Sequence, residues 1–186
     1  MHLLLAAVLQ YGVLISAGHE GRPQSCAHFH HKCNLGAAGE VEWNTIVADA
    51  ATRELRAHGV SVAREPADFA GTYDVDEAVF IHFDGADPPC TSKASTGYHT
   101  EDSQPLARSW RQAYAALFPF GFMPDNFTDN LRDYYGFRQV RARDGAIVIE
   151  LGEITCPQQH AWLAPRLQLL GITIANVLLQ WRQRVP

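Results

Sequence analysis

The sequence predicts an α/β fold with three layers, α/β/α, around a mostly parallel, twisted sheet of about six strands. Short apolar runs, typical of strands buried on both faces, alternate with longer segments that repeat apolar residues every three or four positions, as helices do. The strand-like runs lie at residues 12–17, 60–63, 78–83, 137–142 and 145–150. The helical segments lie at residues 40–58, 104–117 and 158–183. Strands separated by helices of this length indicate parallel pairing.

The individual elements have recognisable ends. The first strand stops at Gly18-His19, and the Gly- and Pro-containing stretch 20–39 is typical of a loop. The helix at 40–58 has one apolar face, and Gly59 is well placed to cap its carboxyl end. Residues 158–183 carry an apolar stripe that we assign to the core, and we expect a kink or break near Pro165.

Length and composition describe one globular domain. The chain has 186 residues, of which 47% are hydrophobic and 19% charged, so we expect residues 1–186 to form a single domain with its own core. The formal charge is −5 and no basic run occurs, which argues against a nucleic-acid partner. We expect a monomer.

The first ten residues are apolar but too short to span a bilayer, so we expect no stable membrane anchor. They also lack the Lys or Arg that begins a signal peptide and a clear small-residue cleavage site. We interpret residues 1–10 as a helix or strand that packs on the domain, with an export signal as the alternative.

Three ionisable residues share an unusual position in this pattern. His19, His82 and Glu150 each lie at the end of an apolar strand, and the carboxyl ends of parallel strands meet at one edge of a sheet. Glu40, at the start of a helix, reaches that edge if the preceding loop folds back. Two imidazoles and a carboxylate form a common catalytic zinc site that leaves the fourth position for water. Glu150, outside the ligand set, is then the candidate general base and acid.

Other assignments stay open. A histidine at a strand end is often a core or loop residue rather than a ligand. Glu42 is an alternative to Glu40 as the ligand, and Glu153 is an alternative base or a supporting residue. Glu20 either orients the metal ligands or faces water, and Asp84 is a candidate supporting residue or substrate contact.

The segment from Cys26 to Cys33 is dense in metal-binding side chains but matches no common structural zinc spacing. Three interpretations remain: a second metal site with His28, His30 and His31, a disulfide between Cys26 and Cys33, or a solvated loop at the rim of the cleft.

Aromatic residues gather between positions 110 and 135. They are Trp110, Tyr114, Phe118, Phe120, Phe122, Phe127, Tyr134 and Tyr135. The first three recur at helical spacing and are expected in the core. The stretch 120–135 carries Pro and Asn residues typical of a surface segment, and we expect any substrate contacts there.

Four short motifs occur in an order that resembles the type 3 family of zinc-dependent N-acetylmuramoyl-L-alanine amidases. They are Ser16–Gly21 (SAGHEG), the ungapped run Glu40–Gly59 with Asn44 and Leu55, Phe80–Ala86 (FIHFDGA) and Val148–Glu153 (VIELGE). The resemblance covers about residues 12–183. Its departures are the segment after Gly21, Asp84-Gly85 in place of an Asn, and Glu153 in place of a Phe, and they concern substrate details more than metal ligands.

The resemblance implies a bare catalytic domain, as in endolysins, that hydrolyses the amide bond between N-acetylmuramic acid and L-alanine in peptidoglycan. It implies Zn²⁺ held by His19, Glu40 and His82, with Glu40 favoured over Glu42, and Glu150 as the proton carrier. The expected location is the periplasm, the cell exterior or the cell wall for a bacterial protein, or the wall reached from the host cytoplasm for a phage protein. Alternatives are another zinc amidohydrolase or peptidase of this fold, or a non-catalytic module that binds the cell wall.

Overall fold

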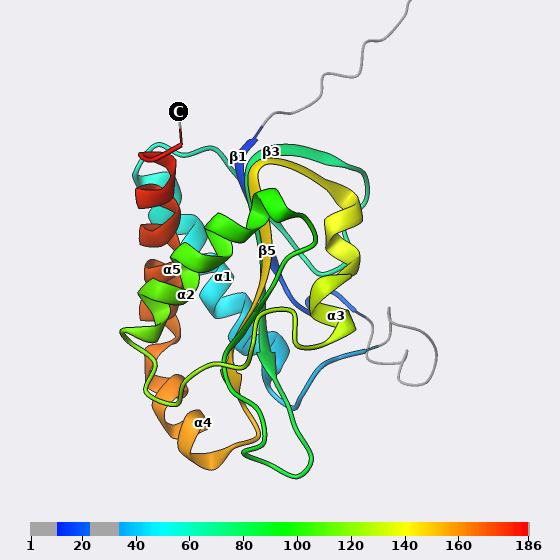
Figure 1. The fold of residues 1–186 in the computed structure, drawn as a ribbon, viewed down its shortest axis with the longest axis vertical. Coiled ribbons are helices and arrows are strands. Elements are labelled where there is room, and N and C mark those ends of the chain that lie inside the picture. The colour runs from blue at the N-terminus through cyan, green and yellow to red at the C-terminus, as the bar shows by residue number, and fades with distance from the viewer. Residues whose placement is uncertain (1–10, 23–33, 186) are drawn as a thin grey trace, which may run out of the picture.

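The computed structural model describes residues 11–22 and 34–185, and Figure 1 shows how their elements are arranged. The strands are β1 (Tyr11–Ala17), β2 (Val62–Glu65), β3 (Tyr73–Asp84), β4 (Ser95–Gly97) and β5 (Val140–Glu153). The helices are α1 (Glu40–Ala57), α2 (Gln104–Ala115), α3 (Asp129–Arg132), α4 (Pro157–Leu163) and α5 (Leu167–Arg182). Short 3₁₀ turns occur at Glu101–Ser103, Tyr135–Gln139 and Ala164–Arg166.

The five strands form one sheet in the order β2-β1-β3-β5-β4. All neighbours pair in parallel except β4, which pairs antiparallel with β5. The predicted α/β class and the mostly parallel sheet are therefore confirmed. The described residues form five strands, however, rather than the expected number of about six.

The difference in strand number comes from β5. The predicted strands at 137–142 and 145–150 are one strand, because a β-bulge lets two residues of β5, Arg143 and Asp144, lie opposite one residue of β3, Asp76. Residues 137–139 belong instead to a 3₁₀ turn. The short edge strand β4 was not predicted from the sequence.

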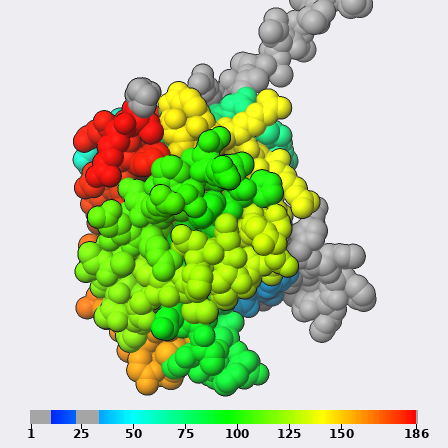
Figure 2. All heavy atoms as spheres, in the orientation of Figure 1, coloured from blue at the N-terminus to red at the C-terminus, as the bar shows by residue number. Residues whose placement is uncertain are grey.

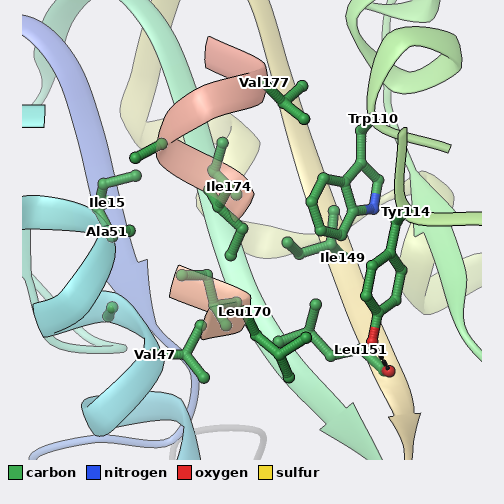
Figure 3. Packing of buried hydrophobic residues seen from close by; sticks show 14 of the residues in the cluster. Ile15, Val47, Ala51, Trp110, Tyr114, Ile149, Leu151, Leu170, Ile174 and Val177 are labelled. Carbon is green, nitrogen blue, oxygen red and sulfur yellow. Dashed lines mark hydrogen bonds between the residues drawn. The ribbon is translucent and has the colours of Figure 1, made fainter. Parts of the chain in front are cut away.

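Helices cover the two faces of the sheet unequally. In Figure 1, α1, α2 and α5 lie on one side of the sheet, and the short α3 lies on the other. Figure 3 shows Leu170 and Ile174 of α5 between Val47 of α1 and the aromatic rings of α2. The opposite face carries a smaller core in which Leu131 and partly buried aromatic residues cover the strands.

The break predicted near Pro165 is present, since a 3₁₀ turn at Ala164–Arg166 separates α4 from α5. The segment Pro157–Arg182 is long and apolar enough to cross a membrane by composition. Leu170, Ile174 and Leu178 are nevertheless buried in the core that α5 forms with α1 and α2. A Cβ at Gly171 would lie 2.4 Å from the carbonyl oxygen of Val47, so α1 and α5 approach closely there. The predicted assignment of this helix to the core is confirmed.

A disulfide joins Cys90, in the loop after β3, to Cys156, in the turn before α4. This pair was not predicted from the sequence. Cys26 and Cys33, the second metal site considered with His28, His30 and His31, and residues 1–10 lie outside the described residues, so those expectations stay untested.

Candidate metal centre

The central strands β3 and β5 place His82 and Glu150 side by side. The two residues are register partners, as are Phe80 and Val148 two positions earlier. Alternation along the strands places all four side chains on the face that α3 covers. Both strands continue beyond these residues, to Asp84 and Glu153, so the pair lies just inside the carboxyl edge of the sheet rather than beyond it.

His19 lies in the turn that follows β1, where its backbone has a positive φ of 61°. This left-handed conformation is uncommon for a residue with a side chain, and such outliers concentrate at functional sites. The Nδ1 atom lies 2.6 Å from the carbonyl oxygen of Asn34. A carbonyl only accepts hydrogen bonds, so Nδ1 carries the proton and the lone pair is on Nε2.

Glu40 begins α1 and brings its carboxylate between the two histidines. Its Oε1 atom lies 3.3 Å from His19 Nε2 and 3.2 Å from His82 Nδ1. One potential ligand atom from each residue lies within 4.8 Å of the others, and all three residues are buried. Glu42, the alternative ligand, is exposed on α1 and is not part of this group.

Hydrogen bonds hold the Glu40 carboxylate in place. Oε2 accepts from the backbone N–H of Ala37 at 2.9 Å, and Oε1 accepts from the N–H of Phe83 and from Asn44 Nδ2, both at 3.3 Å. Asn44 also donates to the carbonyl of Gly18, next to His19. Burial raises the pKa of Glu40, but the hydrogen bonds and charges of the two histidines outweigh it and hold that pKa below its ordinary value.

His82 is fixed from its other side by Tyr134. The Tyr134 hydroxyl lies 3.0 Å from Nε2, while Nδ1 faces Glu40. When Nδ1 presents its lone pair to a ligand, the Nε2–H donates to the Tyr134 oxygen, an arrangement that orients metal-binding histidines. Burial lowers the pKa of His82, which favours the neutral imidazole that a metal requires.

Two glycines leave room for this arrangement. A Cβ at Gly18 would lie 2.3 Å from His82 Cε1, and a Cβ at Gly36 would lie 2.1 Å from Glu40 Oε2. Gly36 also has a φ of 72°, which suits glycine. The backbone therefore approaches the side chains of two candidate ligands more closely than an alanine would allow.

Glu150 differs from Glu40 in its surroundings. The half-buried residue lines the cleft, and within the described part of the chain its buried Oε2 atom has no hydrogen-bond partner. Burial, followed by the charges of Glu40 and Asp84, raises the pKa of Glu150 well above its ordinary value. A divalent cation among His19, Glu40 and His82 would offset the charge of Glu40 that contributes to this shift. The buried oxygen and the donor set beside it fit a bound metal ion.

The three further acidic residues singled out from the sequence have different surroundings. Asp84 lines the cleft and accepts a hydrogen bond from the Ser92 hydroxyl, and burial raises its pKa. Glu153 is buried and accepts from the backbone N–H groups of Cys90 at 2.6 Å and of Ser92 at 2.7 Å. Glu20 forms an ion pair with Arg64 at 2.8 Å.

A cleft of about 720 Å³ opens at this centre and is lined by His19, Glu40, His82 and Glu150. The segment expected to contact substrate contributes Phe127, Thr128, Asn130, Asp133, Tyr134 and Tyr135 to the lining. Figure 2 shows that α2 and the chain that follows it form much of one face of the molecule. Trp110, Tyr114 and Phe118 are buried, which confirms that they belong to the core. Figure 3 shows Trp110 and Tyr114 there. Phe127 is 38% exposed at the cleft, and its contact with a substrate stays a prediction.

Two residues that contact the candidate ligands were not predicted from the sequence to do so. Arg22 lies 3.1 Å from His19. Tyr134, which was expected in a surface segment that contacts substrate, contacts His82 instead. Arg22 follows His19 by three residues, and this short separation was the local indication in the sequence that the two side chains lie close together. Its other side-chain partners, Asp68 and Tyr135, lie 46 and 113 residues away along the chain.

No protein-family model and no curated protein matches the sequence. Solved structures do match. An N-acetylmuramoyl-L-alanine amidase from Clostridium difficile 630 aligns over 95% of this chain and 99% of its own, with 18% identity and a TM-score of 0.65. The amidase AmiC2 of Nostoc punctiforme aligns over 95% and 98%, with 18% identity and a TM-score of 0.70. The catalytic domain of CwlV, an amidase from Bacillus (Paenibacillus) polymyxa var. colistinus, aligns over 93% and 98%, with 16% identity and a TM-score of 0.66.

Proposed function

We propose that this chain, which has the fold of N-acetylmuramoyl-L-alanine amidases, is a zinc-dependent amidase that cleaves the bond between N-acetylmuramic acid and L-alanine in peptidoglycan. The observation that carries the proposal is the convergence of His19, Glu40 and His82 in the cleft of this fold, with Glu150 beside them. The structural alignments support the fold, and the geometry of the site supports the chemistry.

The donor set suits zinc. Two imidazole nitrogens and one carboxylate oxygen are a common set of three protein ligands in catalytic zinc sites. Zinc bound there supplies a Lewis acid that polarises the scissile carbonyl and lowers the pKa of water. His19 Nε2 and His82 Nδ1 both face Glu40 Oε1 and would present their lone pairs to a metal bound beside it. Tyr134 and the Asn34 carbonyl hold the two rings in these orientations.

Glu150 is the proton carrier in this proposal. Its environment favours a bound proton, and it lines the cleft beside the ligands without being one of them. The carboxylate takes the proton of the attacking water and delivers it to the nitrogen of L-alanine as the amide bond breaks. A group with a raised pKa suits both halves of this transfer.

A location outside the reducing cytoplasm is part of the proposal. The disulfide between Cys90 and Cys156 supports it, because disulfides persist mainly in oxidising compartments. Peptidoglycan is also found there. An amidase released from a host cell by a phage would reach the same substrate.

The test combines metal analysis with cell-wall digestion. The purified protein is expected to hold about one zinc per chain and to release new N-terminal alanine from peptidoglycan. A chelator should abolish the release, and added zinc should restore it. A matched pair of variants tests which of the two glutamates on α1 is the ligand. Glu40→Gln should lose zinc and activity, while Glu42→Gln should keep both.

Other outcomes would identify the rival functions. Zinc binding with cleavage of a different amide would indicate another zinc amidohydrolase or peptidase. Wall binding without zinc and without new amino termini would indicate a non-catalytic module and would overturn the proposal.

A further inference from the structure

Arg22 is a buried arginine beside a candidate metal ligand. Its side chain is 3% exposed. Its Nη1 atom lies 2.8 Å from the carbonyl oxygen of Asn34 and 3.1 Å from His19 Nδ1. The Asn34 carbonyl is the same oxygen to which His19 Nδ1 donates. Arg22 and His19 therefore direct two donors at one acceptor.

The remaining donors of Arg22 also have partners. Nε donates to Asp68 Oδ2 at 3.0 Å, and Nη2 donates to Asp68 Oδ1 at 3.3 Å and to the Tyr135 hydroxyl at 3.0 Å. The guanidinium also lies over the Tyr135 ring, 5.4 Å from its centre. Each of its three nitrogens is thus engaged by the protein itself. Arg22 is fixed in place rather than available to bind a carboxylate of a substrate.

The anchors of Arg22 come from distant parts of the chain. Asp68 lies in the loop after β2, and Tyr135 begins the 3₁₀ turn before β5. The Tyr135 hydroxyl donates in turn to the carbonyl of Ala67 at 2.6 Å, which links the two anchors to each other. The guanidinium is held from two sides, so its position relative to Asn34 is defined by the fold.

A neutral His19 ring carries its hydrogen on either Nδ1 or Nε2, and it can bind a metal through Nε2 only when the hydrogen is on Nδ1. The Asn34 carbonyl oxygen only accepts hydrogen bonds, and it lies 2.6 Å from His19 Nδ1 and 2.8 Å from Arg22 Nη1, so both nitrogens donate to it. The 3.1 Å approach of Arg22 Nη1 to Nδ1 is then a contact between two donors that share this acceptor. This arrangement leaves the lone pair on Nε2, 3.3 Å from Glu40 Oε1. Asn34 is exposed, and the hydrogen bond that its carbonyl accepts from the buried Arg22 at 2.8 Å helps to hold that carbonyl in place.

We propose that Arg22 is a positioning residue of the metal centre: it fixes the Asn34 carbonyl and thereby holds His19 in the tautomer and orientation that present Nε2 to the metal. The inference deepens the proposed function and rests on it for the identity of the metal. Removing residues that support metal ligands typically weakens metal binding about 10- to 100-fold.

The first measurement is the zinc affinity of the protein against a competing chelator. Arg22→Met is expected to bind zinc roughly 10- to 100-fold more weakly than wild type. Asp68→Asn, which removes an anchor of Arg22 but no contact to His19, should show a smaller loss in the same direction. Arg22→Lys, which reaches one partner instead of several, should restore part of the affinity and serves if Arg22→Met does not fold.

Arg182→Met is the matched control. Arg182 also forms ion pairs with two carboxylates, Asp76 at 2.9 Å and Glu77, but both lie in the first half of β3, away from His82. Arg182→Met should lower the free energy of unfolding of the protein without changing its affinity for zinc. Equal zinc affinity in wild type and Arg22→Met, within about twofold, would overturn the inference and leave the proposed function intact.

The second measurement needs no metal. Long-range ¹H–¹⁵N correlation spectra of the metal-free protein report which nitrogen of His19 carries hydrogen. Wild type is expected to show the Nδ1–H tautomer, and Arg22→Met should show a mixture of tautomers. An Nε2–H tautomer in wild type, or an unchanged tautomer in the variant, contradicts the role of Arg22 even if the protein binds no zinc.

Discussion

At the scale of single residues, Glu40 and Glu150 show how one cleft gives two carboxylates opposite properties. Glu40 accepts hydrogen bonds from two backbone N–H groups and from Asn44, and the two histidines flank it. The carboxyl group of Glu150 is instead buried near two other carboxylates, those of Glu40 and Asp84. The pKa of Glu40 is lowered and that of Glu150 is raised. Such divergence suits one carboxylate to bind a metal and the other to carry a proton.

The variant Glu150→Gln tests this division between the two carboxylates. The amide keeps the size of the side chain but cannot exchange the proton, so activity on peptidoglycan should fall by roughly 10²- to 10⁴-fold. Zinc content, measured by elemental analysis, should stay at the wild-type level. Loss of zinc together with activity would make Glu150 a ligand, and retained activity would remove its role as proton carrier.

The candidate ligands could be found from the sequence because each lies at the end of an element with a clear pattern. His82 is near the end of an apolar strand, and Glu40 begins an amphipathic helix. Arg22 and Tyr134 could not be found in this way. Their roles depend on contacts between segments far apart in the chain, and such contacts leave no local pattern.

At the scale of the elements, local sequence patterns predicted a helix with a regular apolar face better than they predicted a strand that is bulged or very short. Helix α1 was expected at 40–58 and spans Glu40–Ala57, because its apolar face is regular and Gly59, with φ 78°, ends it. Two strands were predicted where the structure has the single strand β5, because the pairing with β3 absorbs the extra residue as a bulge. Strand β4 has three residues, too few to show a period of two.

The disulfide joins two loops that contribute residues to the lining of the cleft. Cys90 and Cys156 are 66 positions apart, and Asp84–Asp87 and Thr155, which line the cleft, lie next to them. Disulfides typically contribute about 2–4 kcal/mol to stability. Reduction, or the double variant Cys90→Ser/Cys156→Ser, should lower the free energy of unfolding in urea by about that amount.

The double variant also provides the control for reduction, because a reducing agent should not destabilise it further. Glu153 binds the same loop through the backbone N–H groups of Cys90 and Ser92. We therefore expect the folded structure of the loop to persist without the disulfide. Equal unfolding midpoints for oxidised and reduced wild type would contradict the predicted contribution.

At the scale of the whole molecule, the two ends of the central strand β3 carry different charged groups. The candidate metal centre lies near its carboxyl end, at His82. Near its amino end, Arg182 from the last turn of α5 binds the carbonyl of Gly12 at 3.3 Å and forms ion pairs with Asp76 and Glu77. These charged groups connect α5 to β1 and β3, at the end of β3 opposite to the candidate metal centre.

Glu77 makes the stability of the whole molecule depend on pH. The side chain is fully buried, and one of its oxygens has no hydrogen-bond partner among the described residues. Burial raises the pKa of Glu77 to about 7 although Arg182 opposes the shift. From pH 4.5, the ordinary pKa, to about 7, the folded state keeps a proton that the unfolded state loses. The contribution of Glu77 to stability is therefore complete at acid pH and is lost as the pH rises through this window.

The variant Glu77→Gln isolates this contribution, since the amide cannot titrate. Burial of His82 gives the opposite slope in the same range, so the prediction concerns the difference between the two proteins. The stability of wild type relative to Glu77→Gln should decrease by up to about 3 kcal/mol between about pH 4 and about pH 8. Urea unfolding at several pH values measures it. Parallel stability curves for the two proteins would mean that Glu77 stays ionised against Arg182, and that the ion pair outweighs the cost of burial.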